Sequence, residues 1–227
     1  MIRIQSWNIA QDLDKPKEYI KNWNSDIYFL LECGTEEDLK KIVENKFYRF
    51  CDHTYNMAAI SKYEFLSYQE IRHEDVTKPI LYCQFKINNH LLNFFIIHLI
   101  MPINDQEKLD KQIKEVEVIL QKIKDITNGE NTIAMGDFNS RSPLDNETEY
   151  LNVSQSFHEA GFVDSATLID NYQFSPTKID RSNLNKRVDF CMLSKDLSSF
   201  VSDYGVQDTD KSISDHRAIW VDLTIDE

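Results

Sequence analysis

The sequence predicts an α/β fold in which two sheets pack face to face and helices cover the outside. Strand patterns dominate the 227-residue chain, the few helix patterns are amphipathic, and no composition shift marks a linker. Many half-buried strands and a few amphipathic helices bury their apolar faces best in such layers. The length suits one substantial core, so we expect a single domain over residues 1–227.

The N-terminal part of the chain alternates strands with short helices. Ile2 to Trp7 alternates as a strand, and Asp26 to Leu31 is an apolar run that is too short for an independent helix. Pro16 to Trp23 reads as a short helix begun by proline. Thr35 to Glu44 reads as a helix whose first and fourth residues form a capping arrangement. Four further strands are predicted at 47–52, 57–61, 65–72 and 79–87.

The middle of the chain contains the clearest buried strand and the clearest helix. Residues 91–97 are apolar almost without alternation, which is typical of a strand covered on both faces. A capping box of Asn104 and Glu107 then opens a helix. Its apolar stripe spans only two heptads, so we expect it to pack on a sheet rather than form a coiled coil. The stripe consists of Leu109, Ile113, Val116, Leu120 and Ile123.

The last third is strand-rich with polar connections. Asn131 to Met135 is predicted as a strand, and short helical pieces are expected around 147–160. Further strands are predicted at 187–193 and 216–224.

The chain is acidic, with 25 Lys+Arg against 38 Asp+Glu and a formal net charge of −13. Residues 114–227 hold most of the excess, because they carry 11 basic and 21 acidic residues (11 − 21 = −10). A field of this sign repels polyanions, so charge alone argues against a nucleic-acid partner. The crowded carboxylates are either solvated surface or, in part, ligands of a cation.

The cysteines and the N-terminus bear on the cellular compartment. Cys33, Cys51, Cys83 and Cys191 lie far apart without zinc-ligand spacing, so neither a zinc site nor a disulfide framework is indicated. The sequence shows no signal-peptide pattern and no apolar stretch long enough to span a membrane. We therefore expect a soluble, cytoplasmic protein with free thiols.

Residue types that carry chemistry recur at the ends of the predicted strands. A lone aspartate at such a place is usually a turn residue or a cap, and a lone histidine beside apolar residues is usually a core histidine. Loop-proximal ends of a rigid scaffold are nevertheless where functional sites are assembled. The set consists of Asn8, Glu32, His98, Asp137, Asn139, Asp189, Asp215 and His216.

Taken in order, the segments around these residues resemble the endonuclease/exonuclease/phosphatase superfamily over residues 6 to about 223. Gly136–Asn139 (Gly-Asp-Phe-Asn) and Ser214–His216 (Ser-Asp-His) are the strong signals, and Gly161–Asp164 (Gly-Phe-Val-Asp) supports them. One departure is Leu31, where the family usually has glutamine, and we interpret it as a packing change that leaves Glu32 in place. The resemblance implies a four-layer α/β-sandwich of two mostly antiparallel sheets, with the site at one edge.

The resemblance further implies a divalent-metal-dependent phosphodiester hydrolase, most simply a nuclease that cleaves DNA or RNA by attack of water on phosphorus. Carboxylate and amide oxygens suit Mg²⁺ or Mn²⁺, and the lack of Cys/His clusters argues against zinc. By resemblance, Glu32 is the first metal ligand, with Asn8 and Asp215 nearby.

The remaining site residues have catalytic roles by resemblance. His216 and Asp189 form a hydrogen-bonded pair at the scissile phosphate, and Asp137 orients or deprotonates the attacking water. Asn139 holds a phosphate oxygen or that water, and His98 stabilises the transition state. Whether a histidine or an aspartate is the general base stays open.

The substrate stays open as well. A basic group in the acidic half is equally consistent with substrate phosphate contacts and with plain surface; it consists of Lys178, Arg181, Lys186 and Arg187. The short loops favour, as an alternative, a phosphatase or phosphodiesterase for a small nucleotide, phosphoinositide or phospholipid head group. An inactive binding scaffold is the third hypothesis, and retention of every catalytic residue type argues against it. We expect a monomer that acts on nucleic acid or a small phosphorylated substrate.

Overall fold

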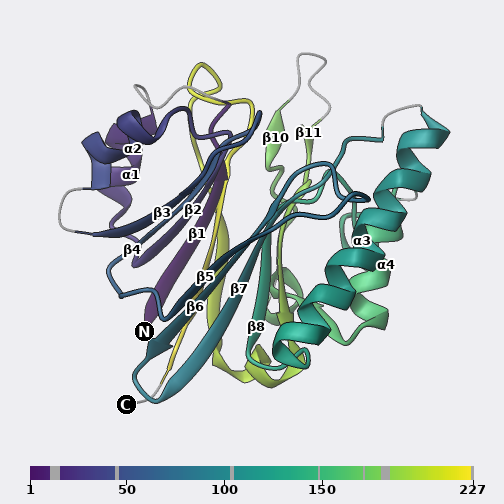
Figure 1. The fold of residues 1–227 in the computed structure, drawn as a ribbon. Helices are drawn as coiled ribbons and strands as arrows, with labels where there is room; N and C mark the ends of the chain where they lie inside the picture. Colours follow the sequence, from purple (N-terminus) through teal and green to yellow (C-terminus); the bar gives the residue numbers. More distant parts are fainter. Residues whose placement is uncertain are drawn as a thin grey trace.

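Two six-stranded sheets pack face to face in the computed structural model, which describes residues 1–10, 16–43, 46–102, 105–147, 149–170, 172–179 and 185–225 (Figure 1). The first sheet contains the N-terminal strand β1 and the C-terminal strand β14 as neighbours, so the two ends of the chain meet in one sheet. Its order is β13 (Val201–Gln207), β14 (Ala218–Leu223), β1 (Ile2–Asn8), β2 (Ile27–Leu31), β4 (Met57–Ser61) and β3 (Phe47–Cys51).

The second sheet is built from the middle of the chain. Its order is β5 (Ser67–Ile71), β6 (Ile80–Ile87), β7 (His90–His98), β8 (Thr132–Asp137), β12 (Asp189–Ser194) and β9 (Phe162–Asp164). Each large sheet has one parallel pair, β1 with β2 and β7 with β8, and its other pairs are antiparallel. Both sheets are therefore mostly antiparallel, as the sequence predicts.

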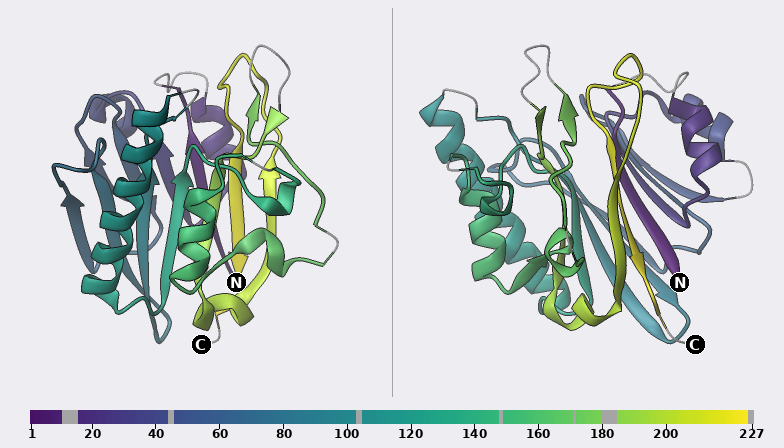
Figure 2. Two further views of the ribbon diagram at one scale, coloured as in Figure 1. Left: turned by 90° about the vertical axis from the view of Figure 1, so that its right-hand side faces the viewer. Right: turned by 180° about the vertical axis from the view of Figure 1, so that it is seen from behind.

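Helices cover the outer face of each sheet, which gives four layers (Figures 1 and 2). The first sheet is covered by α1 (Pro16–Trp23) and α2 (Glu36–Val43), and the second by α3 (Gln106–Thr127) and α4 (Asn152–Glu159). The described residues also form the short 3₁₀ helices η1 (Pro143–Asp145), η2 (Ser165–Leu168) and η3 (Lys195–Phe200), which lie in connections. The α/β-sandwich expected from the sequence is confirmed.

Three apolar clusters hold the layers together. The largest lies between the sheets, where Phe29 stacks on Phe94 with ring centroids 5.3 Å apart and Leu31 is fully buried. A second cluster joins α3 and α4 to the outer face of the second sheet, and a third joins α1 and α2 to the first. Burying each such large side chain contributes about 1.5–3 kcal/mol. Leu31 thus has the packing role that the sequence suggested.

The helix α3 begins one residue later than the predicted capping box implies. Its N-cap is Asp105, whose carboxylate accepts a hydrogen bond from the Lys108 amide at 3.2 Å. Asn104, the cap expected from the sequence, lies outside the described residues. The capping arrangement of α2 is confirmed, because the Thr35 hydroxyl accepts from the Asp38 amide at 3.2 Å.

Some strands were not predicted from the sequence. They are β9, β13 and the hairpin of β10 (Lys178–Ile179) and β11 (Asn185–Lys186). The strand β13 is half exposed and polar, and the hairpin strands have two residues each. Periodicity needs longer segments with one buried face, so these short or edge segments lack the signal.

All four cysteines are buried and free in the structure. Among the described residues, no helix has both the length and the apolar character needed to cross a membrane.

Gly136, next to last in β8, is required by both its backbone conformation and its packing. Its φ is +139°, and a Cβ atom there would overlap the backbone carbonyl of Ile97 in β7. Replacing Gly136 with alanine is therefore expected to lower the free energy of unfolding by at least about 2 kcal/mol, measured by urea titration. Gly129 is the matched control.

Gly129 has φ +78° and open space around its missing side chain. Gly129→Ala adds only the backbone strain, which is about 1 kcal/mol. Equal losses in the two variants would show that the contact with Ile97 is unimportant.

Candidate active site

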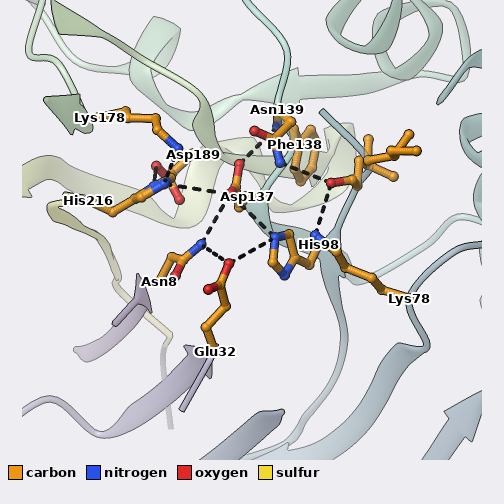
Figure 3. A network of polar contacts seen from close by, with 12 residues as sticks. Asn8, Glu32, Lys78, His98, Asp137, Phe138, Asn139, Lys178, Asp189 and His216 are labelled. Carbon is orange, nitrogen blue, oxygen red and sulfur yellow. Dashed lines mark hydrogen bonds and ion pairs between the residues drawn. The ribbon is translucent and has the colours of Figure 1, made fainter. Parts of the chain in front are cut away.

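Polar side chains from both sheets meet at one edge of the sandwich (Figure 3). In the first sheet, parallel pairing sets Asn8, the last residue of β1, beside Leu31, and Glu32 follows directly. In the second sheet, parallel pairing sets His98 of β7 opposite Asp137 of β8. The carboxyl ends of parallel strands lie at the same edge, which explains why residues so distant in sequence become neighbours.

The carboxylates of Glu32 and Asp137 converge on one amide. The Asn8 Nδ2 donates to Glu32 Oε1 at 3.1 Å and to Asp137 Oδ2 at 3.2 Å. Asn8 and Asp137 are almost fully buried, whereas Glu32 is partly exposed. Two carboxylates held this close without a full positive charge between them are suited to share a cation.

Glu32 has an unusual backbone conformation. Its φ is +53°, in the left-handed region that non-glycine residues seldom adopt. Such strain costs about 1 kcal/mol or more and is concentrated at functional sites. The strain turns the chain at the end of β2 so that the carboxylate faces Asn8 and His98.

His98 lies between the same two carboxylates. Its Nε2 is 3.6 Å from Glu32 Oε1 and 3.6 Å from Asp137 Oδ2. Its ring packs against the Tyr55 ring, with the two centroids 5.7 Å apart. Burial lowers the pKa of His98 to about 3, against the raising effect of the Asp137 charge. The imidazole is therefore neutral at physiological pH and can donate one N–H toward the site.

His216 and Asp189 form the predicted pair. His216 Nδ1 lies 2.9 Å from Asp189 Oδ2, and its Nε2 lies 3.8 Å from Asp137 Oδ2. Burial and the nearby charge of Lys178 lower the pKa of His216, but the charges of Asp189 and Asp137 outweigh both effects and raise the pKa to about 9. The imidazole is therefore a cation at neutral pH.

The backbone around His216 is anchored to β1. The Ser214 hydroxyl donates to the Asn8 carbonyl at 2.8 Å, and the Trp7 indole donates to the His216 carbonyl at 2.9 Å. These buried bonds tie the Ser-Asp-His segment to the strand that carries Asn8. They fix the relative position of residues 206 to 209 positions apart in sequence.

Hydrogen bonds from three neighbouring segments hold Asn139 in place. Its Nδ2 donates to the Leu99 carbonyl at 2.9 Å and its backbone amide donates to Asp137 Oδ1 at 3.0 Å. Its Oδ1 is buried and has no hydrogen-bond partner among the described residues. Gln112 of α3 supports the segment by donating to the carbonyls of Phe138 and Asn139 at 3.2 and 3.1 Å.

A model of the Endonuclease/Exonuclease/phosphatase family matches residues 6–216, a span that contains all of these residues. The chain belongs to this family. Membership identifies it as a metal-dependent hydrolase of phosphate esters.

Solved structures of the same fold superpose on almost the whole of this chain. An AP endonuclease from Archaeoglobus fulgidus has a TM-score of 0.82 at 16% identity, covering 99% of this chain and 100% of that one. The 3′ phosphatase NExo from Neisseria, bound to a product DNA hairpin, has a TM-score of 0.77 at 14% identity, covering 99% and 100%. D. rerio TDP2 complexed with single-strand DNA product has a TM-score of 0.76 at 18% identity, covering 99% of this chain and 99% of that one. No curated protein matches the sequence significantly.

The structure of this family member brings together seven of the eight predicted strand-end residues. The eighth, Asp215, is about half exposed (50%), and its Oδ2 lies 3.7 Å from Lys178 Nζ. Successive side chains of an extended segment point to opposite sides. With His216 buried in the site, its neighbour Asp215 faces the rim instead of the Asn8 and Glu32 pair.

The four predicted phosphate-contacting residues have different locations. Lys178 lies at the site, with Nζ 3.1 Å from His216 Nε2. Lys186 is half-buried on the adjacent strand β11, and Arg181 lies outside the described residues.

Arg187 is not at the site. Its guanidinium is fully buried and bonds to Asp164 Oδ2 at 2.7 Å and Asp145 Oδ2 at 2.8 Å. This corrects the expectation of a substrate contact, because the N–H groups of the guanidinium are bonded to these two carboxylates inside the protein. Arg187 instead ties η1 and β9 to the strand that begins at Asp189.

Lys78 is a site residue that the sequence reasoning missed. It is buried just before β6, its Nζ lies 3.4 Å from the Leu99 carbonyl oxygen, and the Nζ is 4.6 Å from the centroid of the Tyr55 ring. Burial lowers its pKa to about 8, although the charges of Asp137 and Glu32 act to raise it. Its position next to a predicted strand end was the available signal.

The donor set fits a divalent cation. Glu32, Asn8 and Asp137 offer hard oxygen atoms, and Asp137, Asp189 and His216 form a second group whose ligand atoms lie within 4.8 Å of one another. The second group overlaps residues to which the sequence assigned catalytic roles rather than metal binding. Hard oxygen ligands of this kind favour Mg²⁺ or Mn²⁺ over softer metals.

Proposed function

We propose that this family member is a Mg²⁺- or Mn²⁺-dependent nuclease that hydrolyses DNA or RNA phosphodiesters by attack of water on phosphorus. The convergence of acidic, amide and imidazole groups from both sheets at one edge is the observation that carries the proposal. The names of two similar structures support it, since one contains a product DNA hairpin and another a single-strand DNA product.

Glu32 is the principal metal ligand in this proposal, and Asn8 is the second. The Asn8 amide already lies against the Glu32 carboxylate, so a rotation of the amide would present its oxygen to the same point. Asp215 joins them only if its side chain leaves Lys178. A bound divalent ion neutralises phosphate charge and stabilises the leaving oxygen.

Asp137 is the general base. The raised pKa of His216 leaves its imidazole protonated at neutral pH, so it does not accept the water proton. The Asp137 carboxylate, 3.8 Å from His216 Nε2, lies where it can hold a water molecule beside that cation. The water oxygen forms the new bond to phosphorus as its proton passes to Asp137. The ester P–O bond on the opposite side breaks, and the leaving oxygen keeps the electron pair, takes a proton from solvent and departs as the alcohol.

The other groups hold the phosphate. His216, oriented by Asp189, places positive charge against the phosphate oxygens. His98, neutral because burial lowers its pKa, donates its Nε2–H to a non-bridging oxygen. The unpartnered Oδ1 of Asn139 accepts from the attacking water.

The net charge of −13 restricts how a polynucleotide binds. Non-specific binding of duplex DNA depends on a broad basic surface. This chain must hold its substrate locally, through the metal and the few cations at the site. The four buried free cysteines support our further expectation of a reducing, cytoplasmic location.

A substrate panel tests the proposal. The purified protein is incubated with labelled single- and double-stranded DNA, RNA, an activated phosphodiester and inositol phosphates, each with Mg²⁺, Mn²⁺ or EDTA. We expect cleavage of at least one nucleic acid with a metal and none in EDTA. Cleavage of monoesters alone would replace the nuclease by a small-molecule phosphatase, and cleavage of nothing would refute both.

A further inference from the structure

The hairpin of β10 and β11 places two lysines in one row with His216. Lys178 forms a backbone bridge with His216 and pairs in register with Lys186. Both contacts are antiparallel, and directly opposed residues in antiparallel strands project from the same face. The side chains of His216, Lys178 and Lys186 therefore lie side by side, about 5 Å apart at the backbone.

The face of this row is turned toward the active site. The hydrogen bonds from Ile179 N to Asp215 O at 2.9 Å and from Arg217 N to Thr177 O at 2.6 Å flank the bridge between Lys178 and His216. This is the non-hydrogen-bonded pairing, in which opposed side chains come closest. Accordingly, Lys178 Nζ lies 3.1 Å from His216 Nε2 (Figure 3).

Lys186 extends the row away from the reacting centre. It lies one strand beyond Lys178, is half-buried, and contacts no carboxylate within the part of the chain that the structure describes. Lys178 has only the half-exposed Asp215 as an ion-pair partner among these residues. The outer end of the row thus carries a positive charge that the described residues do not neutralise.

Two lysines opposite each other are unfavourable for the hairpin itself. Like charges directly across an antiparallel pair are destabilising, and each hairpin strand has only two residues to offset the repulsion. Among the described residues, no acidic side chain is opposite either lysine in this register. An anion bound between the two ammonium groups would remove the repulsion.

We propose that Lys186, together with Lys178, binds a second phosphate group of the substrate, next to the phosphate that is hydrolysed. The inference rests on the proposed nuclease function and narrows its substrate class to chains in which another phosphate adjoins the scissile one. Lysine is a point charge on a flexible stem, so the second phosphate is either a neighbouring internal diester or a terminal monoester.

The test measures what one added phosphate contributes. We compare kcat/KM for a dinucleoside monophosphate, for the same compound with a 5′- or 3′-terminal phosphate, and for the unphosphorylated trinucleotide. One added phosphate is expected to raise kcat/KM about tenfold in the wild type and about twofold in Lys186→Gln, as for loss of one charge-assisted contact. Lys186→Arg is expected to keep most of the gain.

Lys195→Gln is the matched control. Lys195 is an exposed lysine at the start of η3, on a different part of the fold, and its loss changes the net charge equally. We expect this variant to keep the full tenfold gain. A gain that falls equally in both lysine variants would indicate a general charge effect and overturn the proposal, as would an undiminished gain in Lys186→Gln.

Two readouts separate the proposal from the function on which it rests. Dissociation constants of the same compounds are measured in EDTA, where no hydrolysis is expected. If nothing is cleaved with any metal but the added phosphate still strengthens wild-type binding and not that of Lys186→Gln, the nuclease fails and the phosphate site stands. The trinucleotide distinguishes an internal diester from a terminal monoester as the group bound.

Discussion

Asp137→Asn is expected to lower kcat about 10³-fold while leaving the protein folded. The change removes the negative charge that accepts the water proton and that faces both His98 and His216 at 3.6 and 3.8 Å. Asparagine keeps an oxygen that can accept the bond from the Asn139 amide, so the local backbone keeps its support. Initial rates on a labelled single-stranded oligonucleotide with saturating Mg²⁺ measure the effect.

Asp125→Asn is the control for this variant. Asp125 is exposed in the last two turns of α3 and bonds only to Gln121 of the same helix among the described residues. The same chemical change there should leave kcat within a factor of about 2, because surface substitutions are usually nearly neutral. Wild-type activity in Asp137→Asn, with an unchanged circular dichroism spectrum, would remove Asp137 from the mechanism.

His216→Ala is expected to lower kcat by about 10²- to 10³-fold and to change the pH profile. The active form of His216 in our proposal is protonated, and its pKa is raised to about 9. Wild-type activity should therefore fall as the pH rises through about 9, because the imidazolium then loses its proton. The alanine variant should lack this fall, since no imidazole remains to titrate.

Rates from pH 6 to 10 at fixed Mg²⁺, with His158→Ala as control, measure both effects. His158 is an exposed histidine of α4, so its loss should change neither kcat nor the alkaline limb. If His216→Ala kept the alkaline fall, the titrating group would be another residue and the role of His216 would be wrong. The hydrogen bond from the Trp7 indole to the backbone carbonyl of residue 216 does not depend on the imidazole, so we expect the fold to persist.

Most of the site was predictable because strand ends carry it. Glu32, His98 and Asp137 each follow an apolar run that is recognisable in one sequence, and the parallel pairs bring the ends of such runs to one edge. The two-sheet architecture followed from the same runs. The apolar runs alone did not indicate a reaction. The reaction was predicted from the order of the short motifs, which resembles that of the family.

The missed features depend on three-dimensional contacts without a local pattern. Lys78 joins the site only because folding buries it near Asp137, and Gln112 supports the site although it is a polar residue on the buried side of its helix. The direction of Asp215 depends on which of two adjacent side chains faces inward. Arg187 was expected either to contact a substrate phosphate or to lie on the surface, because its buried partners, Asp145 and Asp164, are distant in sequence.

The pairing of Lys178 with Lys186 could not be predicted either. A register between two-residue strands leaves no periodicity in the sequence. The structure supplies the register, and the register places both lysines on the face that carries His216.

Metal-dependent cleavage of a nucleic acid tests the central claim most directly. A labelled single-stranded oligonucleotide is incubated with wild-type protein and with Glu32→Gln over a titration of Mg²⁺, beside an EDTA arm. We predict cleavage that requires the metal, and a half-saturating Mg²⁺ concentration at least about tenfold higher in Glu32→Gln, because the variant loses the principal carboxylate ligand. Cleavage in EDTA, or the same metal dependence in both proteins, would contradict the account.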